Sequence, residues 1–121
     1  MVLVDTSIWI RFLGNRSPEA AELDRLLGQD EVVGHEFVYG ELLIGDRHGR
    51  RKLLALYEQL PQAQTIPHGE VASFVRHREL HGRGIGWVDV HLLASAMVGH
   101  FQLWTADRKL SIVAREFGIG K

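Results

Sequence analysis

The chain has 121 residues, 45% of them hydrophobic, and its formal net charge is −1 with histidine neutral. This length supports one domain with a substantial core, spanning residues 1–121, and excludes two domains of ordinary size. Cysteine is absent, which excludes disulfides, thiolate metal sites and cysteine nucleophiles, so any bound metal must take oxygen or imidazole ligands.

Short apolar runs alternate with segments of helical periodicity along the chain. Strands are predicted at residues 2–4, 31–33, 64–66 and 102–105. Helices are predicted at residues 6–13, from Pro18 through Leu27, around Glu41, at 53–60, at 70–81, around Asp89 and at 110–117. Strands that alternate with helices are typical of an α/β fold, and we expect a short, mainly parallel central sheet covered by helices on both faces.

Two aspartates come after predicted strands. Asp5 directly follows Val2–Val4, and Asp107 comes shortly after the strand at 102–105. In parallel α/β sheets ligands bind beyond the carboxyl ends of the strands, so we expect both side chains at one edge of the sheet. Each also has a structural alternative, because aspartate is a common residue in turns and at helix N-caps.

Two further carboxylates lie in predicted helices at positions where apolar residues are expected. The residues three and four positions from Glu41 are Phe37, Val38, Ile44 and Gly45. Asp89 lies beside Leu92, Leu93 and Ala96, with His91 and Ser95 on the opposite face. An ionised carboxylate on a buried helix face is costly unless it is paired, protonated or bound to a cation. For Asp89 the alternative is that it complements the dipole of a first helical turn.

Four carboxylates from distant parts of a chain suit Mg²⁺ or Mn²⁺, because these ions prefer oxygen ligands. Such ions activate water and stabilise the attacking and leaving oxygens when a phosphodiester is cleaved. The four residues together therefore indicate a metal site, although each one has a purely structural alternative.

The order and surroundings of these residues resemble the PIN domain, and within it the VapC-type toxins of bacterial and archaeal toxin–antitoxin pairs. The matching stretches are Val2–Ile10, Gly40–Gly45, Trp87–Ala96 and Leu103–Leu110. The resemblance covers essentially the whole chain and rests on the ordered set, since no single motif is specific. It implies a three-layer α/β/α PIN-like fold. One departure is that many relatives have a further acid and an aromatic residue after Asp107, whereas this chain has Lys109 and Leu110.

The resemblance also implies an activity and partners. It implies an endoribonuclease that depends on Mg²⁺, with Mn²⁺ able to substitute, that is often a homodimer and that a cognate antitoxin protein inhibits. Its acidic quartet corresponds to Asp5, Glu41, Asp89 and Asp107, and Thr105 matches a hydroxyl residue near the site. Asp5 and Asp89 are then expected to bind the ion directly. Asp107 binds it directly, through water or at a second ion, and Glu41 acts through water or orients the nucleophile.

Three weaker features accompany the quartet. Basic residues at 47–52, 76, 78 and 83 either contact phosphates or form solvated helix ends. His77 and His81 have the spacing of a zinc-binding pair, but without the glutamate of an HExxH motif they are better interpreted as an exposed helix end. Trp9 and Trp104 are expected in the core. Trp87, beside the glycines at 82–86, is a candidate for stacking on a base.

Two other functions fit an acidic α/β protein. One is a receiver-like regulatory module with an acidic pocket for phosphorylation, although no aspartate follows an apolar run near mid-chain. The other is a nuclease-like fold that binds RNA without cutting it. The apolar runs are too short to cross a bilayer and the start of the chain has no signal-peptide pattern, so we expect no membrane partner and a cytoplasmic location.

Overall fold

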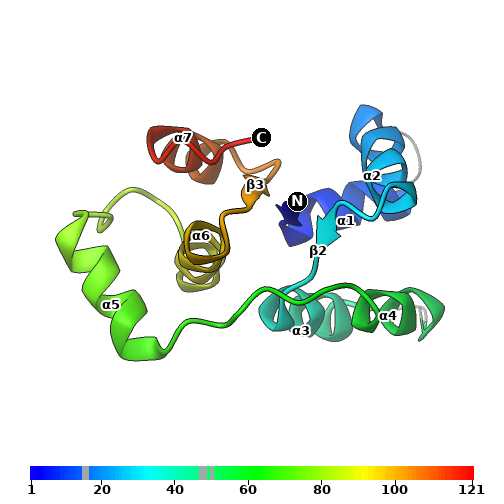
Figure 1. Cartoon of the computed structure of the whole chain (residues 1–121), viewed down its shortest axis with the longest axis horizontal. Coiled ribbons are helices and arrows are strands. Elements are labelled where there is room, and N and C mark those ends of the chain that lie inside the picture. The colour runs from blue at the N-terminus through cyan, green and yellow to red at the C-terminus, as the bar shows by residue number, and fades with distance from the viewer. Residues whose placement is uncertain (15–16, 47–48, 50) are drawn as a thin grey trace.

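The structure of the protein is a computed structural model that describes residues 1–14, 17–46, 49 and 51–121. Strands and helices alternate along the chain (Figure 1). In chain order they are β1 Val2–Val4, α1 Thr6–Gly14, α2 Pro18–Gly28, β2 Val32–Val33, α3 Glu36–Ile44, α4 Arg51–Glu58, α5 His68–His77, α6 Trp87–Gly99, β3 Gln102–Trp104 and α7 Arg108–Glu116. The sequence therefore predicted the order of the helices correctly.

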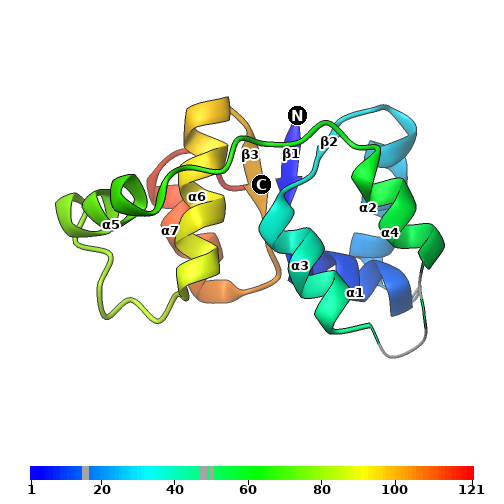
Figure 2. The same cartoon turned by 90° about the horizontal axis from the view of Figure 1, so that it is seen from below.

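The sheet has three parallel strands in the order β2-β1-β3. Leu3 pairs with Val33 on one side and with Leu103 on the other. All of β1 and β2 is buried, in keeping with their β-branched and leucine residues. Figures 1 and 2 show the strands in the middle, with α5, α6 and α7 on the side of β3 and α1, α2 and α4 on the side of β2. This confirms the predicted three-layer α/β/α arrangement around a parallel sheet.

The strand predicted at 64–66 does not form. The chain makes only an isolated bridge between Gly34 and Gln62 as it leaves α4. The carbonyl of Gln64 instead accepts a hydrogen bond from the Ser95 hydroxyl at 2.7 Å. The Ser95 side chain of α6 thus occupies a carbonyl that would otherwise pair with a neighbouring strand. The prediction was wrong because this tertiary contact replaces strand pairing.

Two predicted helices have different bounds. The helix expected at 70–81 ends at His77, because Glu79 has a positive φ of 52° and cannot continue it. The helix expected at 53–60 ends at Glu58. Its buried face is formed by Leu54 and Tyr57, whereas Leu56 is exposed. The apolar residues alone did not show which side of this helix would be covered.

The core lies between the sheet and the helices that pack on it. Trp9 is only 2% exposed and packs edge-on against Tyr57, with ring centroids 5.3 Å apart. Trp104 is also buried, which confirms the prediction for these two tryptophans, while Trp87 is 43% exposed. No helix in the described part of the chain is both long and apolar enough to span a bilayer.

Candidate active site

Asp5 lies directly beyond β1, in the middle strand of the sheet. Its backbone N–H donates to the Trp104 carbonyl at 2.8 Å, so it continues the pairing between β1 and β3. The side chain is buried, and its Oδ2 accepts hydrogen bonds from the hydroxyls of Ser7 at 2.7 Å and Thr105 at 2.8 Å. Two hydroxyls on neighbouring elements therefore fix the orientation of this carboxylate.

The same hydroxyls connect Asp5 to the turn after β3. The Ser7 hydroxyl accepts a hydrogen bond from the Ala106 N–H at 2.9 Å, and the Thr105 hydroxyl accepts one from the Asp107 N–H at 3.0 Å. The resemblance placed Thr105 near the site, whereas Ser7 was not predicted there. Its position could have been suspected because it is a hydroxyl residue two positions after an aspartate that ends a buried strand.

Asp107 is the N-cap of α7. Its Oδ1 accepts a hydrogen bond from the Leu110 N–H at 3.1 Å, while the side chain remains exposed. The structural alternative for this residue is therefore present in the structure. Capping uses one carboxylate oxygen, and no other described residue hydrogen-bonds the second, so a cap and a site residue are compatible.

Asp89 lies in the first turn of α6 and is half-buried. Its Oδ2 accepts a hydrogen bond from the Gly86 N–H at 2.8 Å, which stabilises the start of the helix. Burial raises the pKa of Asp89, the negative charges of Asp5, Asp107 and Glu41 raise it further, and the Gly86 hydrogen bond partly offsets these effects. The other three carboxylates of the predicted quartet are thus close enough to Asp89 to act on it electrostatically.

Glu41 reaches the same place from α3. Its Oε1 accepts a 2.6 Å hydrogen bond from the hydroxyl of Thr6, the residue after Asp5. The expectation that Glu41 lies on a buried apolar face is wrong, because its side chain is exposed and Ile44 beside it is 88% exposed. The buried face of α3 contains Val38 and Leu42 instead.

The expectation that one face of α6 is polar is also wrong. His91 and Ser95 are as buried as the apolar residues around them, since Val90 to Ala96 are all buried. Ser95 hydrogen-bonds within the core to His35 as well as to Gln64. The helix lies in the middle of the molecule, so burial does not separate its faces.

One arrangement is common to all four carboxylates. Each uses one oxygen in the hydrogen bonds described above: Oδ2 of Asp5, Oε1 of Glu41, Oδ2 of Asp89 and Oδ1 of Asp107. No hydrogen bond to the second oxygen occurs within residues 1–14, 17–46, 49 and 51–121. The side chains are therefore oriented through one oxygen and retain another for a ligand. In Figure 2, β1 and β3 both point towards the lower side of the view, where α6 and α7 begin.

The chain is similar to known proteins over nearly its full length. Residues 2–116 match the PIN domain family. Ribonuclease VapC32 of Mycobacterium tuberculosis is 43% identical over 120 residues, which cover 98% of this chain and 94% of that protein. The chain is a PIN-domain protein of the VapC type. Ribonuclease VapC1 of Methanocaldococcus jannaschii is a more distant relative, 26% identical over 123 residues that cover 98% of this chain and 84% of the other.

The oxygen-only donor set of this PIN domain fits a hard divalent cation, which prefers carboxylate ligands and retains some water. Burial and, to a smaller extent, the charges of the other three carboxylates raise the pKa of Asp89, and a bound cation would offset that negative charge. Within the described residues, however, no three acidic or histidine side chains are already grouped closely enough to hold an ion. The side chains would have to draw together around it.

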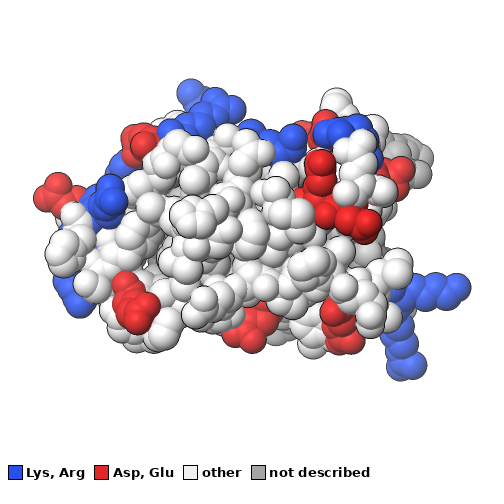
Figure 3. All heavy atoms as spheres, viewed as in Figure 1, with Lys and Arg blue, Asp and Glu red and all other residues white. Residues whose placement is uncertain are grey.

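The predicted basic residues contribute less to this site. Arg47, His48 and Arg50 lie outside the described residues. Arg83 forms an ion pair with Glu116, and the guanidinium of Arg78 lies over the ring of Phe117. On the face shown in Figure 3, basic and acidic side chains are interspersed around the rim and no field of one sign crosses the middle.

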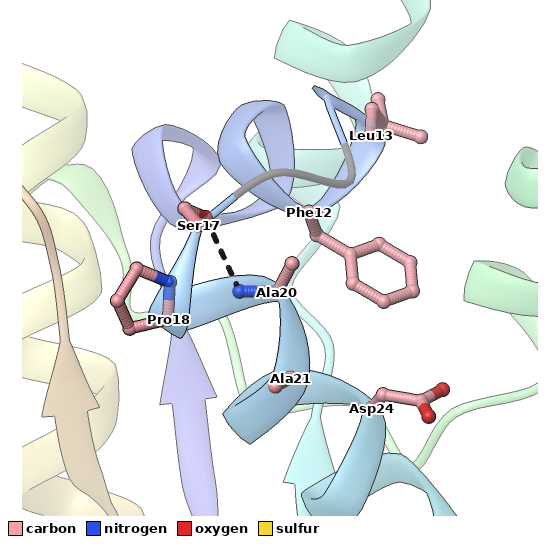
Figure 4. Close-up of a pocket in the computed structure, with 7 residues that line it drawn as sticks. All are labelled: Phe12, Leu13, Ser17, Pro18, Ala20, Ala21 and Asp24. Atoms are coloured by element: carbon pink, nitrogen blue, oxygen red, sulfur yellow. Dashed lines mark hydrogen bonds between the residues drawn. The ribbon is translucent and has the colours of Figure 1, made fainter.

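The predicted histidine pair lies outside the acidic cluster. His77 contacts the Ser73 carbonyl at 3.2 Å, as expected of an exposed helix end. A cavity of about 680 Å³ lies between α1 and α2, where its lining includes Phe12, Pro18 and Asp24 (Figure 4). None of the four carboxylates lines it, so this cavity is separate from the candidate site.

The hydroxyl of Thr105 gives a stability prediction. Thr105→Val is expected to lower the free energy of unfolding by about 2 kcal/mol, because Asp5 loses one donor and the Asp107 N–H loses its acceptor. Urea denaturation measures the effect. Thr105→Ser retains the hydroxyl and is the control. Equal stability of the valine and wild-type proteins would show that these hydrogen bonds do not hold the strand ends together.

Proposed function

We propose that this protein is an endoribonuclease that depends on Mg²⁺, with Mn²⁺ able to substitute, and that it hydrolyses RNA phosphodiester bonds at Asp5, Glu41, Asp89 and Asp107. The observation that supports this most strongly is the set of four oriented carboxylates, each with one oxygen that no other described residue hydrogen-bonds. Both named relatives are ribonucleases, which supports RNA as the substrate.

The proposed roles follow from the surroundings of each residue. Asp5 is buried and the most firmly oriented, so we assign it with Asp89 to direct binding of the ion. Asp107 binds the ion directly, through water or at a second ion. Glu41 is exposed and acts through water or orients the nucleophile. When bound, a divalent ion would supply positive charge that activates water and stabilises the charge on the cleaved phosphate.

Three further proposals rest on the VapC type. We propose that the protein is the toxin of a toxin–antitoxin pair, that a cognate antitoxin protein inhibits it, and that it forms a homodimer. We also propose that residues 1–121 act as one domain and that the protein works in the cytoplasm, where RNA is available. The PIN match over residues 2–116 argues against the receiver-like alternative. Binding of RNA without cleavage remains a distinct outcome of the experiment below.

The test is an RNA cleavage assay with purified protein free of antitoxin. Total cellular RNA and a panel of structured and single-stranded RNAs are incubated with Mg²⁺, with Mn²⁺ and with a chelator. Asp89→Asn should abolish cleavage but stay folded, because the amide oxygen can still accept the Gly86 hydrogen bond. Asp24→Asn, an exposed change on α2, is the matched control and should cut normally. Folded wild-type protein that binds RNA but never cuts it with either ion would overturn the proposed activity.

A further inference from the structure

An open groove runs between α3 and the first turn of α6. Its volume is about 400 Å³, and its walls include Phe37, Gly40 and Ile44 of α3 and Trp87 of α6. Glu41 also lines the groove. A group bound here would therefore lie next to the proposed ion site.

The exposed Trp87 ring is held in place by other rings. It packs edge-on against His91, with centroids 4.9 Å apart at 83°, and against His68 at 4.9 Å and 51°. His91 in turn packs against Phe37 at 4.7 Å. Rings from α3, α5 and α6 thus support one another from the core to the groove. A tryptophan supported in this way offers a fixed flat surface and loses little conformational freedom when a ligand stacks on it.

The charge of the groove limits what it can bind. Glu36 and Glu41 line it, and no lysine or arginine of the described residues does. A phosphate group would be repelled here. A neutral planar ring would not, and the exposed Trp87 and Ile44 side chains provide apolar surface for it. The groove is therefore suited to a nucleobase, while the phosphate of the same strand would lie at the proposed ion, whose positive charge offsets the negative charge of the carboxylates.

We infer that this groove binds a base of the RNA strand next to the cleaved phosphate, and that the base stacks on Trp87. The inference rests on the proposed ribonuclease function. A base can reach Trp87 only if it is unpaired, so binding at this groove favours an unpaired nucleotide over one held in a continuous duplex. Trp87 is then a residue that determines specificity and does not take part in the bond cleavage itself.

Tryptophan fluorescence tests the inference without cleavage. Trp9 and Trp104 are buried, so quenching by a ligand reports mainly on Trp87. A single-stranded RNA ten-mer is titrated into Asp5→Asn protein, in which cleavage is expected to be blocked, and the same RNA is then tested as a duplex. The single strand should quench the fluorescence more than the duplex. Trp87→Leu should remove the quenching and weaken binding roughly 5- to 100-fold.

Two variants control for indirect effects. Trp87→Phe keeps a ring and should retain part of the affinity, which a general loss of folding would not produce. Val98→Ala changes an exposed residue near the other end of α6 and should bind RNA normally. Unchanged RNA affinity in folded Trp87→Leu would overturn the inference. A change in the oligomeric state of Trp87→Leu, measured by size-exclusion chromatography, with no change in RNA affinity would also overturn it. The groove would then contact a second copy of the chain.

Failure of the proposed function has a different signature. If wild-type protein cuts no RNA but Trp87-dependent quenching is present, the ribonuclease proposal fails and the groove still binds single-stranded RNA. If wild-type protein cuts RNA but loss of Trp87 changes neither affinity nor the pattern of cleavage sites, the base-stacking inference fails and the ribonuclease proposal stands.

Discussion

Replacing Asp5 with asparagine is expected to lower the rate of RNA cleavage at least about 100-fold while the protein stays folded. The amide oxygen can accept the same hydrogen bonds from Ser7 and Thr105 that Oδ2 now accepts. The second carboxylate oxygen, however, becomes a neutral amide group that cannot bind a cation. The change therefore removes the proposed ligand and retains the hydrogen bonds that position it. Cleavage rates measured with Mg²⁺ and urea denaturation together check the prediction.

A second measurement on this variant does not require RNA. The negative charge of Asp5 raises the pKa of Asp89, so its removal should lower the pKa of Asp89 towards the ordinary value for aspartate. Carbon-13 NMR of the aspartate carboxyl groups follows this in metal-free protein. Asp24→Asn is the control for both measurements. Normal cleavage by folded Asp5→Asn protein, together with an unchanged titration of Asp89, would place Asp5 outside the site.

Acidification from pH 6.5 to pH 4 is expected to lower the free energy of unfolding by up to about 3 kcal/mol through His35. Nδ1 of His35 accepts a hydrogen bond from the Phe37 N–H at 3.0 Å, and Nε2 lies 3.0 Å from the Ser95 hydroxyl. That hydroxyl donates to the Gln64 carbonyl, so Nε2 carries the proton and donates to it. The ring is therefore buried and neutral, and both of its nitrogens take part in hydrogen bonds. A second proton would occupy Nδ1, which could then no longer accept the hydrogen bond that caps α3.

The sign of the effect follows from the two pKa values. Burial lowers the pKa of His35 from 6.5 to about 4 in the folded protein, although Glu36 nearby opposes this. Between these values the unfolded chain binds a proton that the folded chain does not bind. Stability is therefore complete above pH 6.5 and falls as the pH decreases towards 4. At neutral pH the shift makes no contribution.

Other groups titrate in the same pH range. The prediction therefore concerns the difference in pH dependence between wild-type protein and a variant that lacks His35. Burial lowers the pKa of His91 and adds to the loss, whereas the raised pKa of Asp89 has the opposite effect. His35→Asn keeps a side chain that can cap α3 but has no titrating group. Urea denaturation of metal-free protein between pH 4.5 and 7.5 should give a shallower dependence on pH for the variant. Parallel curves for the two proteins would contradict the role of His35.

Local patterns in the sequence predicted most of the fold. Strand β1 and the aspartate after it could be predicted because a short apolar run, a polar residue and a helix start are adjacent in the chain. The order of strands and helices then places Asp5 and Asp107 at one edge of a parallel sheet. Each of these conclusions depends on neighbouring residues and on a general property of α/β folds.

The incorrect predictions depended on tertiary packing. Periodicity showed that Glu41 lies on a helix, but only the neighbouring elements decide that this side of α3 is exposed. The same holds for Ser95, which sequence reasoning placed on a polar face and which lies in the core with His35. Ser7 was missed because its partners at 105 and 106 are about a hundred residues away in the chain.

Calorimetric titration of Mn²⁺ into metal-free protein tests most directly whether these carboxylates form a metal centre. Wild-type protein should bind the ion, Asp5→Asn and Asp89→Asn should each bind it at least about tenfold more weakly, and Asp24→Asn should match the wild type. Binding that is equal in all four proteins would place the ion elsewhere. No binding by folded wild-type protein at millimolar Mn²⁺ would contradict a metal centre at these four residues.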